Sequence, residues 1–286
     1  MNLCNEKDIR ELLGRHGFRF SKSMGQNFLI DPQIPADIAA SSGADGQCGV
    51  LEIGPGIGPL TAELAQRAGK VVSVELDKSL LPVLAETMAP YPNVEIVPGD
   101  AMKLDLNALV EEKFQGLRPI VSANLPYNIT TPVLTKLIET PCIETITVLI
   151  QKEVAQRLSV AQGDSDGGSF SLFLQYYMET EYLFDVPREK FLPAPKVTSA
   201  VLRCVRREKP AVEVEDEAFF FKVMGGGFLL RRKTLANSLA AALKGFDKET
   251  IQASIEACGL RPDVRGERLT LQDFANLAAT LARAKK

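Results

Sequence analysis

The sequence contains a single histidine, His16, and this scarcity excludes several classes of enzyme. Ser-His-Asp and Cys-His catalysis, and metal sites built from several histidines, need imidazole groups at the reacting atoms. His16 is followed by Gly17 in a basic segment, which favours a surface position. We therefore predict a reaction that does not depend on an imidazole of the protein.

Other signals are also missing. The five cysteines form no Cys-x-x-Cys pair, so the sequence predicts reduced thiols and no metal site. No apolar run approaches the length of a membrane span. The first twelve residues contain Glu6, Asp8 and Glu11, which a secretory or transit peptide would normally lack. These absences predict a cytoplasmic protein with no membrane association, and we predict a monomer.

The net charge of −3 is unfavourable for binding nucleic acid, but the charges are segregated. Residues 31–150 carry seven Lys/Arg against fifteen Asp/Glu, whereas residues 225–245 carry four basic residues and no acidic ones. Residues 1–30 and 181–210 are also net basic, at +2 and +3. Local basic charge attracts polyanions even when the total is negative. The alternative is random clustering of solvated charges.

Strand-like and helix-like segments alternate over roughly the first 150 residues. The predicted strands are Gly49–Ile53, Val71–Glu75, Val94–Val97, Pro119–Ala123 and Thr145–Gln151. The predicted helices are residues 6–17, Pro59–Ala68 and Lys78–Met88. This alternation predicts an α/β fold with a Rossmann-like parallel sheet. Leu183–Val186 and Val197–Val205 are expected to close it as an antiparallel pair, and Gly163–Gly168 to form a flexible loop.

The last third of the chain has a helical pattern. The polar segment Glu208–Glu217 is a plausible linker, which predicts domains at 1–209 and 210–286, the second small and α-helical. The predicted helices there are Ala218–Met224, Leu229–Leu243, Lys248–Ala257 and Leu271–Arg283. Three glycines inside a helix would cost roughly 2–3 kcal/mol, so we predict a break or hinge at Gly225-Gly226-Gly227.

Successive strand ends carry residues suited to a nucleoside cofactor. Gly54, Gly56 and Gly58 form a turn between a strand and a helix, where backbone can approach a ligand closely. Glu75 ends the next strand and could accept from both ribose hydroxyls, and Asp100 ends the third and could accept from an adenine amine. A dinucleotide dehydrogenase shares the first two features, but Pro59 replaces its third glycine. We favour S-adenosylmethionine.

The tetrapeptide Asn124-Leu125-Pro126-Tyr127 follows the fourth predicted strand. Ligands of open α/β sheets bind at such carboxyl ends. The Asn124 side-chain oxygen and a backbone carbonyl beside Pro126 could accept from an exocyclic amine, while Tyr127 could lie against the ring. Asn-x-Pro-Tyr resembles the amine-methylating motif of N6-adenine methyltransferases. An ordinary turn is the competing interpretation.

These motifs together resemble the small-subunit ribosomal RNA adenine dimethyltransferases of the KsgA type, which are related to the Erm large-subunit enzymes. The resemblance runs from about residue 8 to 283. Its motifs are Gly25–Leu29, Leu51–Gly58, Val74–Asp77, Gly99–Ala101, Asn124–Thr130, Phe191–Val197 and Arg231–Leu235. Leu125, Asn128–Thr130 and the extended C-terminal half resemble the small-subunit branch. The departures are Met24, where leucine is usual, and the triple glycine.

The resemblance implies which residues contact the cofactor and the substrate. It places cofactor contacts at Asn27, Leu29, Gly54, Glu75, Asp100 and Asn124, and we predict the same role for Gln26 and Gly56 in these motifs. The implied activity is N6,N6-dimethylation of two adjacent adenosines near the 3′ end of 16S ribosomal RNA in an immature small subunit. Tyr127 and then Phe191 are the predicted stacking partners of the target base, although Phe191 could instead be a core residue at a strand end.

A set of basic side chains is predicted to contact RNA phosphates: Lys22, Lys196, Arg203, Arg206, Arg207, Arg231, Arg232 and Lys233. Each alone could be a solvated or ion-paired side chain. Two other functions stay open: an Erm-like methyltransferase of large-subunit RNA, and a ribosome-assembly factor that needs no catalysis.

Overall fold

The computed structural model describes residues 1–18 and 26–284 and divides into two compact units. The first unit is Met1–Ala155 with Thr180–Arg206, and the second is Gln156–Glu179 with Arg207–Lys286. The predicted division at residue 209 therefore differs from the structure in one respect. Gln156–Glu179 belongs with the C-terminal residues, because its aromatic side chains pack into their core.

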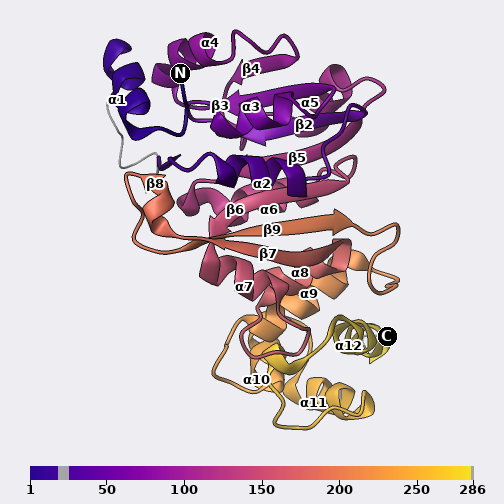
Figure 1. The fold of residues 1–286 in the computed structure, drawn as a ribbon. Coiled ribbons are helices and arrows are strands. Elements are labelled where there is room, and N and C mark those ends of the chain that lie inside the picture. Colours follow the sequence, from indigo (N-terminus) through magenta and orange to yellow (C-terminus); the bar gives the residue numbers. More distant parts are fainter. Residues whose placement is uncertain (19–25, 285–286) are drawn as a thin grey trace. The chain divides into compact units, whose positions relative to one another are not determined.

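Within the described residues, one seven-stranded sheet forms the centre of the first unit (Figure 1). The spatial order is β4-β3-β2-β5-β6-β9-β7, and a separate two-stranded sheet pairs β1 with β8. The strands are β1 (Phe28–Leu29), β2 (Cys48–Ile53), β3 (Lys70–Glu75), β4 (Val94–Pro98), β5 (Arg118–Asn124), β6 (Thr145–Gln151), β7 (Met178–Val186), β8 (Phe191–Leu192) and β9 (Ser199–Arg206). The five strands predicted in the first 151 residues are confirmed within one or two residues at each end.

Strands β2 to β6 run parallel, and β9 pairs antiparallel with β6. The carboxyl ends of β2, β3, β4 and β5 consequently meet at one edge of the sheet. The two segments predicted to close the sheet are confirmed as neighbours, β7 and β9. The Rossmann-like α/β class predicted from the alternation is therefore confirmed.

The helices are α1 (Glu6–Arg15), α2 (Gln33–Ser41), α3 (Pro59–Ala65), α4 (Leu81–Thr87), α5 (Leu106–Lys113), α6 (Thr130–Ile138), α7 (Lys152–Ser159), α8 (Ser169–Tyr177), α9 (Glu217–Phe228), α10 (Leu235–Ala242), α11 (Lys248–Ala257) and α12 (Leu271–Ala284). Several begin at a side chain that accepts a backbone N–H, such as Asn5 before α1 and Asp216 before α9. Such caps satisfy N–H groups that have no partner within the helix.

One face of the sheet buries an aliphatic layer beneath α2 and α3. Ile38 of α2 and Leu64 of α3 pack in one cluster with Val50 and Ile120 from the central strands. All six residues of β2 are buried. A near-continuous apolar strand of this kind is typical of a parallel sheet that is covered on both faces.

The second unit is built around aromatic side chains. Tyr176 of α8 is 1% exposed and Phe220 of α9 is 0% exposed, and their ring centroids lie 5.3 Å apart. Tyr176 Oη also donates to Glu217 at 3.2 Å. Helices α8 and α9 therefore share one core, although they are far apart in the sequence.

The prediction of a break at Gly225-Gly226-Gly227 is wrong, because α9 continues through all three residues. The glycines allow neighbouring segments to approach closely. A Cβ on Gly226 would lie 2.9 Å from Ala242 Cβ, and one on Gly227 would lie 2.8 Å from the Phe274 ring. Gly225 is exposed, and a Cβ there would meet nothing within 4 Å. The close packing at Gly226 and Gly227 thus offsets the unfavourable helix propensity of the three glycines.

This arrangement predicts opposite effects for two similar substitutions. Gly225→Ala should stabilise the protein by about 1 kcal/mol, because alanine favours a helix and its methyl has open space. Gly227→Ala should destabilise it by about 1–2 kcal/mol, because Phe274 is fully buried and cannot yield to the added methyl. Urea unfolding followed by circular dichroism would measure both, and equal shifts for the two variants would contradict the packing explanation.

Candidate active site

A cavity of about 210 Å³ opens at the carboxyl ends of the first unit's parallel strands. Its walls come from segments that follow β2, β3, β4 and β5, together with the segment around β1. The lining includes all the predicted cofactor-binding residues and the whole tetrapeptide: Gln26, Asn27, Leu29, Gly54, Gly56, Glu75, Asp100, Asn124, Leu125, Pro126 and Tyr127. The structure thus brings these residues to one place from five separate parts of the sequence.

The turn after β2 requires its glycines. Gly54, Gly56 and Gly58 have φ values of 71°, 63° and 94°, a region that side chains other than glycine rarely adopt. A Cβ on Gly58 would lie 2.4 Å from Met88 Cε, and one on Gly56 would lie 3.1 Å from the Phe28 ring. Gly54 and Gly56 line the cavity, so backbone without side chains faces it there, which fits a cofactor lying against the turn.

Glu75 is oriented by two backbone donors at the end of β3. Asp77 N donates to Oε1 at 2.7 Å, and Gly56 N donates to Oε2 at 3.3 Å. Burial raises the pKa of Glu75, whose side chain is only 6% exposed. A carboxylate held in this way suits two adjacent hydroxyl groups of a ribose.

Two other predicted cofactor residues have polar partners in the protein. Gln26 Nε2 donates to Asp77 Oδ2 at 2.7 Å and joins the segment before β1 to the end of β3. Asp100 Oδ1 accepts from Met102 N at 2.9 Å, which fixes the turn after β4. Asp100 keeps its second oxygen 3.8 Å from Lys103 Nζ. Both residues therefore shape the cavity wall as well as lining it.

Asn124 is held with its oxygen available as an acceptor. Its Nδ2 donates to the backbone oxygen of Asn27 at 3.5 Å, so the donor end of the amide is engaged, and Oδ1 has no hydrogen-bond partner among the residues that the structure describes. Leu125 N donates to Leu149 O at 3.1 Å, which anchors the following residue to β6. The backbone geometry of β5 and β6 thereby fixes the direction of Asn124.

The carbonyl of Pro126 already has two donors. Ile129 N lies 3.2 Å from it, and Thr130 Oγ1 donates at 3.3 Å. A carbonyl oxygen has two lone pairs, so this one has little remaining capacity. The Leu125 carbonyl is then the better second acceptor for a ligand amine, a choice that the sequence left open.

Phe191 is placed differently from the prediction that it stacks on the target base. Its side chain is 2% exposed and packs with Leu29 in the aliphatic cluster of the sheet. The cause is β8, which pairs Phe191 with Leu29 and turns the ring into the core. Phe191 is thus a packing residue here, as its position at a strand end also allowed, and Tyr127 is the half-buried aromatic that lines the cavity.

A buried acid at this site was missed in the sequence. Glu52 lines the cavity, is 1% exposed, and accepts hydrogen bonds from Thr61 Oγ1 at 2.6 Å and Ser73 Oγ at 2.7 Å. Burial raises its pKa to about 7 despite these two donors. Its position as an acidic residue inside an otherwise apolar strand could have indicated a buried carboxyl group.

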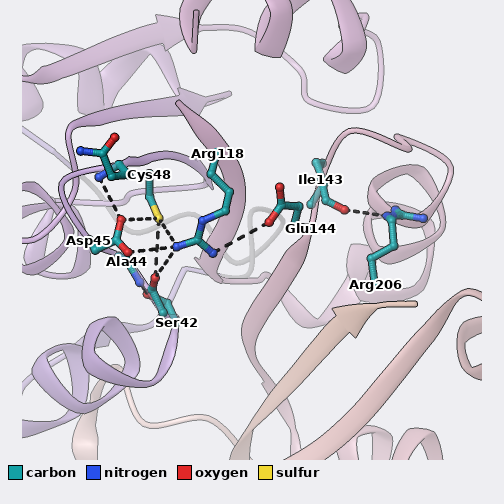
Figure 2. A network of polar contacts seen from close by, with 10 residues as sticks. Ser42, Ala44, Asp45, Cys48, Arg118, Ile143, Glu144 and Arg206 are labelled. Atoms are coloured by element: carbon teal, nitrogen blue, oxygen red, sulfur yellow. Dashed lines mark hydrogen bonds and ion pairs between the residues drawn. The ribbon is translucent and has the colours of Figure 1, made fainter. Parts of the chain in front are cut away.

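Two of the predicted phosphate contacts have structural roles instead. Arg206 donates to the carbonyl oxygens of Ile143 at 2.6 Å and Ile138 at 2.8 Å, and Figure 2 shows the first of these bonds. Arg207 Nη1 binds Glu179 Oε1 at 2.9 Å. Both guanidinium groups are therefore bound to oxygens of the protein, Arg206 to backbone carbonyls between α6 and β6 and Arg207 to a carboxylate near the start of β7.

The other basic residues differ in exposure. Lys196 of the first unit and Arg231, Arg232 and Lys233 of the second are exposed. Arg203 is partly buried, with its Nε shielded from solvent. Lys22 lies outside the described residues. In the described ranges 1–18 and 26–284, no helix is long and apolar enough to span a membrane and no acidic, His or Cys cluster could hold a metal.

Comparison with known proteins identifies the family. A family model described as ribosomal RNA adenine dimethylase matches residues 17–283. The chain belongs to the ribosomal RNA adenine dimethylase family. A family member from Bacillus mycoides (strain KBAB4), named ribosomal RNA small subunit methyltransferase A, is 45% identical over 284 residues, which are 98% of this chain and 97% of that protein. A Bacillus cereus (strain B4264) protein of the same name has the same identity and coverage.

Two solved structures of methyl-transferring enzymes have the same fold. The crystal structure of the 23S rRNA methyltransferase ErmE aligns with a TM-score of 0.66 and 26% identity, covering 89% of this chain and 99% of that one. A dimethyladenosine transferase from Plasmodium falciparum aligns with a TM-score of 0.73 and 24% identity, covering 87% and 95%. The family match agrees with the Rossmann-like sheet, and this chain is an rRNA adenine dimethyltransferase.

Proposed function

We propose that this enzyme dimethylates N6 of two adjacent adenosines near the 3′ end of 16S ribosomal RNA, using S-adenosylmethionine, in the cytoplasm. The choice of 16S over 23S RNA is supported by sequence identity. The chain is 45% identical over its full length to a small-subunit methyltransferase, but only 26% identical to the 23S rRNA methyltransferase ErmE. The orientation of Asn124, with Oδ1 left as an acceptor at the cavity, is the observation that carries the chemistry.

The cavity fits the cofactor by the groups that it presents. Gly54 and Gly56 line the cavity without side chains, and Glu75 offers an oriented carboxylate for the ribose. Asp100 stands at the next strand end, where it could accept from the adenine amine. S-adenosylmethionine, when bound, supplies a methyl group on a sulfonium as the electrophile.

The protein's contribution is to hold the target amine. Adenine N6 is a poor nucleophile, because its lone pair is delocalised into the ring. Asn124 Oδ1 and the Leu125 carbonyl can accept both N–H groups, which favours a pyramidal nitrogen that points at the methyl. The nitrogen becomes acidic as it is alkylated, so its proton can pass to water without a strong base, and alignment of the reactants supplies much of the rate.

A second transfer uses the same geometry. One methylation removes one N–H and leaves the lone pair, so the remaining N–H still has an acceptor. The base must leave its stack at a cost of a few kcal/mol, and stacking on Tyr127 offsets about 1–3 kcal/mol of it. We propose no role for a metal in these steps.

The test is methyl transfer from labelled cofactor to purified ribosomal particles. The enzyme should label small-subunit particles isolated from cells that lack it, with mass spectrometry finding dimethyladenosine at two adjacent positions near the 3′ end of 16S RNA. Equal or greater labelling of large-subunit particles would favour an Erm-like substrate. The absence of labelling in both, with particle binding retained, would favour an assembly factor.

The exposed cations after α9 are proposed as part of the RNA-binding surface. Arg231, Arg232 and Lys233 follow one another in a turn before α10. Replacing all three with alanine should weaken binding to the RNA and reduce the slope of log K against log salt by about 2, since each lost phosphate contact removes about 0.7. Filter binding at several salt concentrations would measure the slope.

A control for the effect of net charge lies in the same unit. Arg261 is exposed and forms an ion pair with Asp263 at 2.7 Å. Arg261→Ala removes one positive charge and should leave the salt slope unchanged. If it lowered the slope as much per charge as the triple variant, the effect would come from net charge rather than from this turn.

A further inference from the structure

Tyr127 is tied to a residue far away in the sequence. Its hydroxyl oxygen lies 2.5 Å from Ser199 Oγ at the start of β9. Tyr127 begins the short turn of 3-10 helix that follows Pro126, and it lines the cavity. Ser199 does not line the cavity and is 0% exposed, so it can act on a ligand only through Tyr127.

The backbone of Ser199 is fixed on both sides. It pairs with Gln151 in the antiparallel ladder of β6 and β9, and Lys152 N donates to Thr198 O at 3.0 Å. Its hydroxyl therefore has little freedom to follow a moving partner. Burial raises the pKa of Tyr127, so its hydroxyl remains protonated over the working pH range.

We propose that Ser199 is a positioning residue that holds the Tyr127 ring in the plane needed to stack on the flipped adenine. The hydroxyl bond fixes the tip of the ring, and the backbone at its base is set by the turn that follows Pro126. Without that bond, the ring can rotate about its side-chain torsions, and fewer bound bases reach the aligned geometry. This inference rests on the proposed adenine substrate.

The expected signature is a loss in kcat rather than in cofactor binding. Ser199→Ala should lower kcat about tenfold, the equivalent of one hydrogen bond of a buried partner. Dissociation of S-adenosylmethionine, measured by calorimetry, should stay within about twofold, because the turn after β2 and Glu75 are unaffected. A general loss of structure would weaken both.

Tyr127→Phe removes the same bond from the other side and keeps the ring. It should lower kcat as much as Ser199→Ala, and the double variant should be no worse than either single one. Multiplying losses in the double variant, or kcat within twofold of the unmodified enzyme in either single variant, would overturn the proposal. If Ser199→Ala does not fold, Tyr127→Phe carries the test alone.

Ser122→Ala is the matched control. Ser122 is another fully buried strand serine, on β5, and its Oγ has no hydrogen-bond partner among the described residues. Its kcat should equal that of the unmodified enzyme, and a tenfold loss there would show that any buried serine has this effect. Failure of the unmodified enzyme to methylate small-subunit particles would refute the proposed function. The role of Ser199 is decided separately, by the kcat of each variant relative to the unmodified enzyme, measured on whichever RNA the enzyme methylates.

Discussion

Asn124→Ala is expected to reduce methyl transfer at least about 100-fold, while binding of the small-subunit particle stays within about twofold. The variant removes the acceptor that faces the cavity, and losing one oriented polar group at a reacting centre typically costs 10²- to 10³-fold in rate. Single-turnover transfer of labelled methyl measures the rate, and filter binding measures the affinity.

Asn124→Asp tests the acceptor oxygen separately from the hydrogen bond that orients it. The carboxylate can still accept from an amine, but it cannot donate to Asn27 O, which it would instead repel. We expect a rate between those of Asn124→Ala and the unmodified enzyme. If Asn124→Ala kept near-normal methylation, Asn124 would not be the amine acceptor, and if all three proteins bound particles but none methylated, the assembly-factor role would gain support.

Glu52→Gln is expected to make stability less dependent on pH. The unfolded chain should release this proton near the ordinary value of 4.5, whereas the folded chain holds it until about pH 7. The stabilisation of the folded state by this raised pKa is therefore complete below about pH 4.5, and it is lost as the pH rises to about 7. The total loss is about 3 kcal/mol.

Glutamine can accept from both Thr61 and Ser73 without carrying a charge. Relative to the unmodified enzyme, the variant should gain about 2–3 kcal/mol of stability between pH 5 and pH 8. Urea unfolding without cofactor at pH 5, 6, 7 and 8 measures the difference. Glu181→Gln, at an exposed position of β7, is the control, and a Glu52→Gln difference that stays constant with pH would mean that Glu52 ionises in the ordinary acidic range.

The sheet and the cavity were predictable because their signals are local. Each parallel strand is a short apolar run, and the residue that ends it is polar, as in Glu75, Asp100 and Asn124. The shared edge of a parallel sheet then brings these ends together. The sequence could not show which hydroxyls and amides pair across the fold, so the contacts of Ser199 and Gln26 were not foreseen.

The errors have a common physical cause, which is tertiary packing. Gly226 and Gly227 are poor helix residues in isolation, but neighbouring side chains fill the space that they leave. Phe191 resembles a cavity residue by motif, yet strand pairing turns it inward. Arg206 and Arg207 look like phosphate ligands until the oxygens around them are known.

The second unit is assembled from two stretches of chain separated by Thr180–Arg206, and this limits how the protein can be cut. A fragment that starts at Arg207 would lack Tyr176 and Leu172, and the remaining helices would expose the hydrophobic surface that those residues cover. A usable fragment needs Gln156–Glu179 rejoined to the C-terminal residues by a short designed linker. During synthesis, likewise, α8 is made before the C-terminal helices that pack against it. Its aromatic side chains can be buried only after roughly the last hundred residues have been made.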